Sequence, residues 1–168
     1  MRIAVTDACI FIDLIELDLI SDFFQLELQL HTTVDVMNEL FQEQKQVLVA
    51  YQKVEKLIVH ILNEEDFSKM DKMAFPKGLS PEDRSVIYVA FGLENGIVLS
   101  SDKLVRKCAE RHSLEYHGLF WIFDLLVTNC ICSKAKAVSK IQKLLTINTM
   151  YASTKTRKEI EVRVRKWS

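Results

Sequence analysis

Short apolar runs alternate with helical patterns along this chain, and this alternation constrains the fold more than any other feature. Residues 3–5 and 97–99 are continuous, β-rich apolar runs of the kind found in strands buried on both faces of a parallel sheet. Residues 26–30 alternate apolar and polar side chains and predict a strand with one covered face; residues 57–62 and 114–116 are further candidates, the last an edge strand. Helical patterns between these runs indicate βαβ units and a mostly parallel sheet, and so an α/β, single-domain, three-layer α/β/α architecture.

The helices predicted between the strands have identifiable starts and stops. Thr32 or Thr33 can cap a helix that runs through Phe41. Ser80 before Pro81 is a strong helix start, and the pair at 95–96 (Asn-Gly) ends that helix. The remaining helical patterns cover residues 10–17, 20–24, 44–54, 64–73, 102–111, 119–127, 134–145 and 156–164.

At 168 residues the chain has the size of one domain, and no linker composition interrupts it. We expect residues 1–150 to form the main domain and residues 151–168 a basic C-terminal helix that extends it. The net charge of −1 does not by itself indicate a nucleic-acid binder. Residues 1–50 are mainly acidic and the last helix is mainly basic. This asymmetry either brings a polyanion beside an acidic site or is simply a solvated amphipathic helix.

The cysteines and the N-terminal segment bear on the compartment. Cys9, Cys108, Cys130 and Cys132 lie within apolar periodic segments, which predicts reduced thiols rather than a disulfide framework. The apolar N-terminal stretch is interrupted by acids, so it predicts neither a membrane span nor a secretory signal. We therefore expect a cytoplasmic protein without a membrane partner.

Four acidic residues follow apolar runs or lie on the helix after one: Asp7, Glu39, Asp83 and Asp102. Residues just past the carboxyl ends of parallel strands converge at one edge of the sheet, where ligands bind. Carboxylates gathered there raise one another's pKa unless a cation lies between them. Hard divalent ions prefer oxygen ligands, so the pattern predicts a Mg²⁺ or Mn²⁺ site.

Each acid taken alone also has a structural explanation. Asp83 and Asp102 can satisfy free N–H groups at helix starts, and Glu39 can be a solvated surface residue. Asp7 is the hardest to explain this way, because it ends a strand that should be buried and an unpartnered buried carboxylate is costly.

The order and local sequence of these acids resemble the PIN-domain family, which includes the VapC-type toxin ribonucleases. The four matching segments are residues 5–14 (VTDACIFIDL), 33–40 (TVDVMNEL), 79–90 (LSPEDRSVIYVA) and 99–107 (LSSDKLVRK). The resemblance spans residues 1–145. We favour Asp83 over its neighbour Glu82 as the third acid. Cys9 departs from the family pattern, which often has Asn or Ser there.

This resemblance implies a metal-dependent endoribonuclease that hydrolyses RNA phosphodiesters. Mg²⁺ or Mn²⁺ would be held by Asp7, Asp83 and Asp102, with Glu39 binding directly or through water and Ser100 in a supporting role. The resemblance further implies the toxin of a type II toxin–antitoxin pair, silenced by a small antitoxin protein and able to form a homodimer. Apolar side chains around Phe23 and at residues 47–51 either form the dimer surface or belong to the core.

Two other hypotheses remain open. The second hypothesis is a PIN-like module that binds RNA or protein without cutting; retention of all four acids speaks against it, whereas Cys9 and the basic C-terminal helix leave room for it. A phosphoaspartate enzyme or receiver with Asp7 as nucleophile is less favoured, because Cys9 stands where such phosphatases carry a second aspartate and Lys103 is out of register for a receiver. The four histidines, His31, His60, His112 and His117, lack metal-binding spacing and are interpreted as structural.

Overall fold

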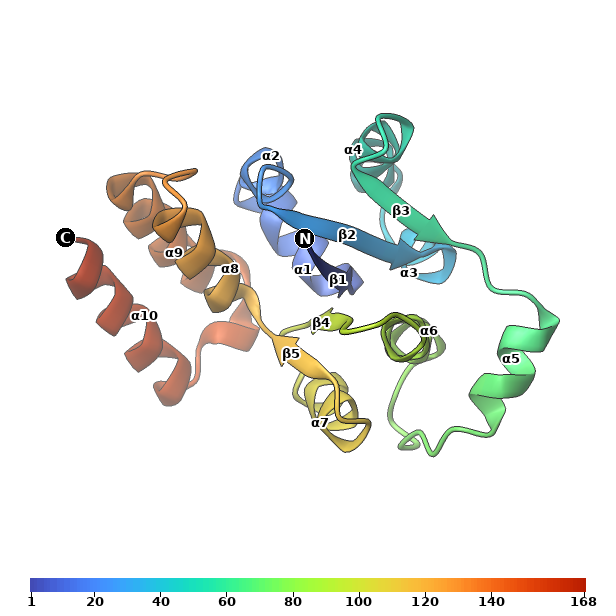
Figure 1. Ribbon diagram of the computed structural model, residues 1–168. Coiled ribbons are helices and arrows are strands. Elements are labelled where there is room, and N and C mark those ends of the chain that lie inside the picture. The colour runs from blue at the N-terminus through green and yellow to red at the C-terminus, as the bar shows by residue number, and fades with distance from the viewer. The chain divides into compact units, whose positions relative to one another are not determined.

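A five-stranded parallel sheet organises the structure, a computed structural model that describes residues 1–168 (Figure 1). The strand order is β3-β2-β1-β4-β5, and every neighbouring pair is parallel. The strands are β1 (Arg2–Thr6), β2 (Leu28–Thr33), β3 (Leu57–His60), β4 (Ile97–Leu99) and β5 (Glu115–His117). The predicted α/β class and parallel sheet are therefore confirmed.

Helices connect all of the strands. They are α1 (Ala8–Glu16), α2 (Ile20–Phe23), α3 (Val34–Glu39), α4 (Gln42–Lys53), α5 (Glu64–Asp71), α6 (Pro81–Gly92), α7 (Lys103–Arg111), α8 (Leu119–Thr128), α9 (Lys134–Ile147) and α10 (Thr154–Trp167), with a 3₁₀ turn η1 (Thr149–Tyr151) before α10. No helix combines the length and the apolar character needed to cross a membrane. All four cysteines are free thiols.

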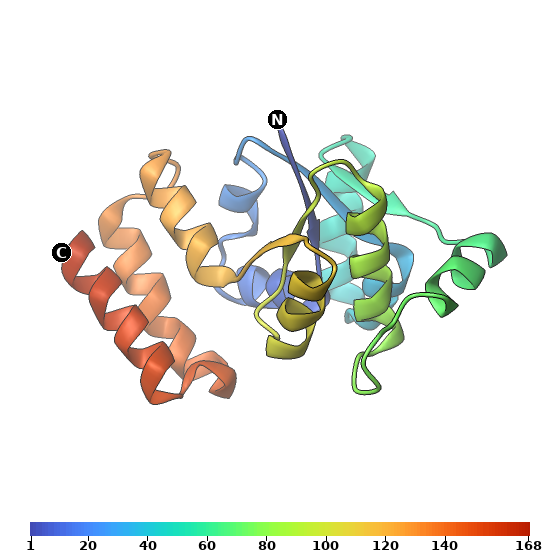
Figure 2. The ribbon, with the colours of Figure 1, turned by 60° about the horizontal axis from the view of Figure 1, so that its bottom comes forward.

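The chain forms two compact units. Unit 1 comprises Met1–Ile12 and Glu27–Leu119 and contains the whole sheet; unit 2 comprises Asp13–Leu26 and Phe120–Ser168 and is helical. Within unit 1, α4 lies on one side of the sheet and α6 and α7 lie on the other (Figures 1 and 2), which gives the three layers predicted from the alternation of strands and helices.

The sheet changes its direction of growth beside β1. Strands β1, β2 and β3 follow one another toward one edge, whereas β4 and β5 lie on the opposite side of β1. The boundary between β1 and β4 is thus the topological switch point, and the carboxyl ends of these strands are where an open α/β sheet binds ligands. In the register Thr6 pairs with Leu99, so the residues that follow β1 and β4 leave the sheet together.

Strand β2 differs from its sequence prediction. The alternation at 26–30 predicted one covered face, but the strand runs from Leu28 to Thr33, and its last four residues are all buried. The reason is position: β2 lies between β1 and β3, so both of its faces are covered near its carboxyl end. Phe23 and Phe24 are also buried, which makes them core residues rather than a surface.

Helix boundaries follow the local signals with one correction. Thr33, not Thr32, caps α3 by accepting from the N–H of Val36 at 3.2 Å. That helix ends at Glu39, and Phe41, which was predicted to lie on its apolar face, is 75% exposed and begins α4 instead.

The turn between α6 and β4 requires its Asn-Gly pair. Asn95 has a positive φ of 56°, and a Cβ placed on Gly96 would lie 2.6 Å from the carbonyl oxygen of Ala90. Any larger residue than glycine at position 96 would therefore push β4 away from the end of α6.

Candidate metal centre

Asp7 lies directly after β1, at the switch point of the sheet. Its N–H donates to the carbonyl oxygen of Leu99 at 3.1 Å, which continues the pairing of β1 with β4 past the end of the strand. Its Oδ1 accepts from the N–H of Ile10 in the first turn of α1 at 3.0 Å. The residue is 1% exposed, and Oδ2 is buried without a hydrogen-bond partner. A buried carboxylate oxygen left unpaired is costly unless a ligand uses it.

The surroundings of Asp7 disfavour the ionised form of its carboxyl group. Burial is the main cause that raises the pKa of this carboxyl to about 7, and the neighbouring Ser100 hydroxyl and the hydrogen bond from the Ile10 N–H lower it only in part. The charges of Asp83 and Asp102 raise this pKa further. Two more carboxylates therefore act on Asp7, as expected for residues that converge at one sheet edge.

Asp102 follows β4 and caps α7. Its Oδ1 accepts from the N–H groups of Leu104 and Val105 at 2.8 and 3.2 Å, and its own N–H donates to the Ser100 hydroxyl at 3.1 Å. The helix-cap role considered from the sequence is therefore real. It uses one carboxylate oxygen and leaves Oδ2 for another partner, so capping and metal binding are compatible in this residue.

Asp83 occupies the first turn of α6, where the Ser80 hydroxyl accepts from its N–H at 3.1 Å. Burial raises the pKa of the Asp83 carboxyl, and the charges of Asp102 and Glu82 raise it further, against a lowering by the Ser80 hydroxyl. A carboxylate in the first turn of a helix would ordinarily have a lowered pKa. Its acidic neighbours and partial burial outweigh that effect here.

Glu39 is the last residue of α3 and is exposed. Partial burial raises its pKa, followed by the charges of Glu82 and Asp83. Glu39 thus interacts electrostatically with Asp83 and not with Asp7. Glu82 at the start of α6 is the acid that we considered less favourable than Asp83 as a metal ligand. Its charge also raises the pKa of Glu39 and of Asp83.

The structure therefore brings all four predicted acids into one electrostatic neighbourhood. In the arrangement of the side chains as they stand, no group of three or more His, Cys, Asp or Glu residues forms a ready metal-ligand set. Carboxylates that lack a counter-ion repel one another. The donor chemistry nevertheless fits a hard divalent cation, because the group is all oxygen and includes the unpaired Oδ2 of Asp7.

A chain of buried hydroxyls connects two of the acid-bearing helices, and no local pattern in the sequence indicates it. Ser85 Oγ donates to the carbonyl oxygen of Glu82 at 2.6 Å, so it must accept from Thr33 Oγ1, which lies 2.7 Å away. Thr33 Oγ1 in turn accepts from the N–H of Val36. Both hydroxyl residues are fully buried. The chain fixes the start of α3, which carries Glu39, against the first turns of α6, which carries Asp83.

Histidines stay outside this neighbourhood, since none is among the groups that shift the pKa values of Asp7, Glu39 and Asp83. His31 and His60 instead pair with each other across β2 and β3, with 2.7 Å between His31 Nδ1 and His60 Nε2 and their rings stacked. Burial lowers the pKa of His31 to about 4, and the charge of His60 adds to that effect. The pair is apposed by sheet register, a relation that no local spacing signals.

The sequence matches one known protein family. A family model described as a PIN domain matches residues 3–166, which is nearly the whole chain. The match covers all four acids, Ser100 and most of α10. A comparison with curated proteins gave no match.

Proposed function

Because this chain belongs to the PIN-domain family, whose members are in general nucleases that use divalent metal ions, we propose that it is a metal-dependent endoribonuclease. One observation carries the proposal: at the switch point of a parallel sheet, the charges of Asp83 and Asp102 raise the pKa of Asp7, which has a buried oxygen without a hydrogen-bond partner. A buried carboxylate whose pKa is raised by neighbouring carboxylates is a group that a bound divalent cation stabilises.

The position of each acid determines the role that we propose for it. Asp7, Asp83 and Asp102 would hold Mg²⁺ or Mn²⁺, with Glu39 at the exposed side binding it directly or through water. A divalent ion held there lowers the pKa of a bound water and offsets charge on the phosphate. Ser100, directly after β4, supports the site, because its hydroxyl accepts from the Asp102 N–H and lowers the pKa of Asp7.

The test is cleavage of a mixed pool of structured RNAs with Mn²⁺ or Mg²⁺, comparing the wild type with Asp7→Asn and Asp83→Asn. We expect each substitution to reduce cleavage at least a hundredfold, since both remove a metal-binding oxygen while keeping shape. Asp71→Asn on α5 is the matched control, because Asp71 is exposed and does not contribute to the pKa shifts of Asp7, Glu39 and Asp83. Glu82→Gln separates the two neighbouring acids, and we expect it to lower cleavage less than tenfold.

Three results would count against the proposal. Cleavage that survives chelation of divalent ions would exclude the metal-dependent reaction. Equal loss in Asp7→Asn and Asp71→Asn would exclude this site. Metal binding by calorimetry without any cleavage would favour the alternative, a PIN-like module that binds RNA or protein without cutting it.

The cellular role is a separate proposal that depends on the family resemblance alone. We propose that the chain is the toxin of a type II toxin–antitoxin pair, silenced by a small antitoxin protein, and that it forms a homodimer. A small open reading frame beside its gene and co-purification of the encoded protein would support this role. Size-exclusion chromatography with light scattering tests the dimer, and a monomer across the micromolar range would exclude it.

A further inference from the structure

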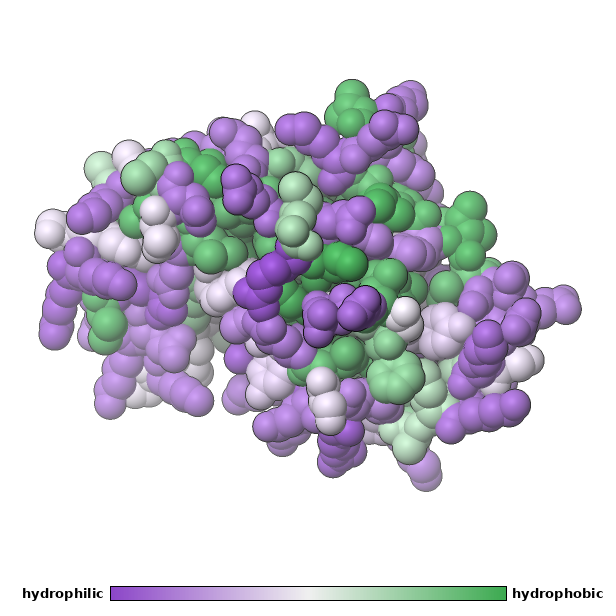
Figure 3. All heavy atoms as spheres, in the orientation of Figure 1, coloured by the Kyte–Doolittle hydropathy of each residue, from purple (hydrophilic) through white to green (hydrophobic).

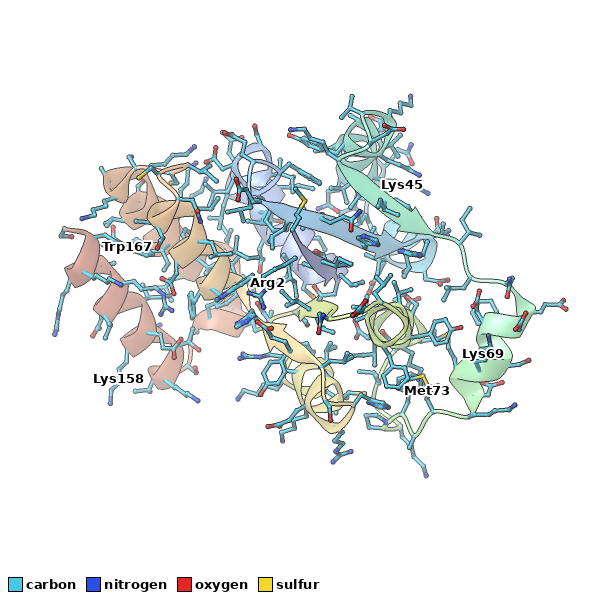
Figure 4. The ribbon with its side chains drawn as sticks, in the orientation of Figure 1. Arg2, Lys45, Lys69, Met73, Lys158 and Trp167 are labelled. Carbon is cyan, nitrogen blue, oxygen red and sulfur yellow. The ribbon has the colours of Figure 1, made fainter.

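Helix α10 presents two sides of opposite character. Ile160 and Trp167 are buried, and the Trp167 ring stacks on that of Phe123 at a centroid distance of 6.4 Å. At 100° per residue, the side opposite Ile160 carries Lys155, Lys158, Val162, Arg165 and Lys166, all of them exposed. Figure 4 labels Lys158 and Trp167 on this helix, and hydrophilic side chains cover much of the α10 region in Figure 3.

The cations on the two sides also differ in their pairing. Arg163, on the partly buried side, donates to both oxygens of Asp124 at 2.9 and 2.8 Å and lies 3.7 Å from Glu159. None of the four cations on the outward side forms a salt bridge. The charge of Arg163 is therefore neutralised by carboxylates of the protein itself, whereas the charges of the four outward cations are available to solvent or to a polyanion.

We propose that this outward basic side of α10, defined by Lys155, Lys158, Arg165 and Lys166, docks the phosphate backbone of the RNA. The proposal rests on the function proposed above, which makes RNA the substrate. At a rise of about 1.5 Å per residue, the four cations extend over about 17 Å, enough to follow several successive phosphates. The side carries no aromatic residue on which bases could stack, so it positions the strand without reading its sequence.

The test measures binding separately from cleavage. In the Asp7→Asn background, Lys155, Lys158 and Lys166 are changed together to Gln, and the affinity for a fluorescent single-stranded RNA is measured by anisotropy over a range of salt concentrations. The matched control changes Lys53, Lys56 and Lys72 to Gln, because these are also three exposed lysines without a salt bridge. Circular dichroism verifies that both variants are folded.

We expect the α10 variant to bind RNA at least tenfold more weakly at low salt, with a log–log salt slope that is shallower by about 2, since each lost phosphate contact removes about 0.7. The control should lose less than threefold. Equal losses in the two variants would reduce the effect to net charge and overturn the proposal, as would no loss in either. Binding to phosphatidylserine vesicles that depends on α10, without such a loss for RNA, would also overturn it.

Cleavage assays in the otherwise wild-type chain distinguish this inference from the proposed nuclease. If the wild type cuts RNA and the α10 variant binds and cuts it equally well, the nuclease stands and the docking surface is wrong. If nothing is cut but RNA binding still depends on α10, the nuclease is wrong and the docking surface stands.

Discussion

Two buried aspartates of this chain, Asp7 and Asp13, differ in how their carboxylate oxygens are hydrogen-bonded. Asp13 is 2% exposed, but Oδ1 accepts from Asn148 at 3.0 Å and Oδ2 from the Tyr151 hydroxyl at 2.9 Å. Asp7 is equally buried and has a partner on one oxygen only. Both belong to the same matching segment, but only Asp7 directly follows a strand. Of the two, only Asp7 has a buried carboxylate oxygen without a hydrogen-bond partner, and this oxygen is available to a ligand.

The first prediction is that Asp7→Asn stabilises the metal-free protein. The pKa of Asp7 is raised from 3.8 to about 7, so the native state binds the proton more tightly than the unfolded state. The contribution of the Asp7 carboxyl to the free energy of unfolding is therefore most favourable below pH 4. It decreases as the pH rises from 4 to 7, and above 7 the ionised carboxylate destabilises the native state to its full extent. Asn has no charge to bury and still accepts from the Ile10 N–H.

We expect urea denaturation in EDTA to show Asp7→Asn more stable than the wild type at pH 8 by on the order of 4 kcal/mol, from the three-unit shift, with the difference vanishing near pH 4. Asp71→Asn should follow the wild type at every pH. If the difference in the free energy of unfolding between Asp7→Asn and the wild type is the same at every pH, the charge of Asp7 does not destabilise the native state.

At the scale of secondary-structure elements, the site depends on the way α3 and α6 are joined. The hydroxyls of Thr33 and Ser85 form a single chain between the two helices, with every proton direction set by the carbonyl at one end and the N–H at the other. A chain of this kind transmits position, because neither helix start can move without breaking a buried hydrogen bond. Glu39 and Asp83 thus owe part of their relative placement to residues that do not bind metal.

The second prediction is that Thr33→Val and Ser85→Ala each weaken metal binding without removing a ligand. Each leaves a buried polar group unpaired, which costs about 1–2 kcal/mol of stability, and groups that orient metal ligands typically change affinity 10–100-fold. Denaturation and Mn²⁺ calorimetry measure the two effects, and their double variant should show coupling, since they share one bond.

Ser133→Ala is the matched control, because Ser133 caps α9 by accepting from the Lys136 N–H at 3.1 Å and lies in unit 2. It should cost similar stability and leave the Mn²⁺ affinity unchanged. If all three substitutions weaken metal binding equally, the effect is general destabilisation and not positioning.

At the scale of the whole molecule, the four acids all belong to unit 1, whereas both tryptophans, Trp121 and Trp167, belong to unit 2. Helix α1 starts directly after Asp7 and contributes residues to both units. Its side chains Ile10, Phe11 and Leu14 are completely buried. Because one buried helix is shared, we expect the two units to unfold in one transition.

The third prediction uses this arrangement. Mn²⁺ at a hundredfold excess over its Kd should stabilise the wild type by about 2.7 kcal/mol, or raise the Tm by about 5–10 °C for a chain of this size. The tryptophan fluorescence of unit 2 should report the same shift as far-UV circular dichroism. Asp83→Asn should show little shift. A dichroism transition that moves while the tryptophan transition does not would show that the units unfold separately.

The amino-acid sequence by itself determined the local elements and the identity of the acids. Short, β-branched apolar runs such as residues 97–99, bounded by turn residues, favour a buried strand, and Ser80 with Pro81 starts a helix because the cap and the fixed φ are local properties. The order of acids after strands then predicted a common sheet edge, because parallel strands end on the same side. In the structure, the charges of Asp83 and Asp102 act on Asp7, and the charge of Asp83 acts on Glu39.

Only the tertiary structure decided which atoms are paired. The bonds from Thr33 to Ser85 and from His31 to His60 join residues 52 and 29 positions apart, and the burial of the β2 face depends on its neighbours in the sheet. Hydrogen bonding and desolvation are set by distances of a few ångströms between such remote segments, and no local pattern encodes these distances. For the same reason, that Asp13 is satisfied and Asp7 is not could be learned only from the fold.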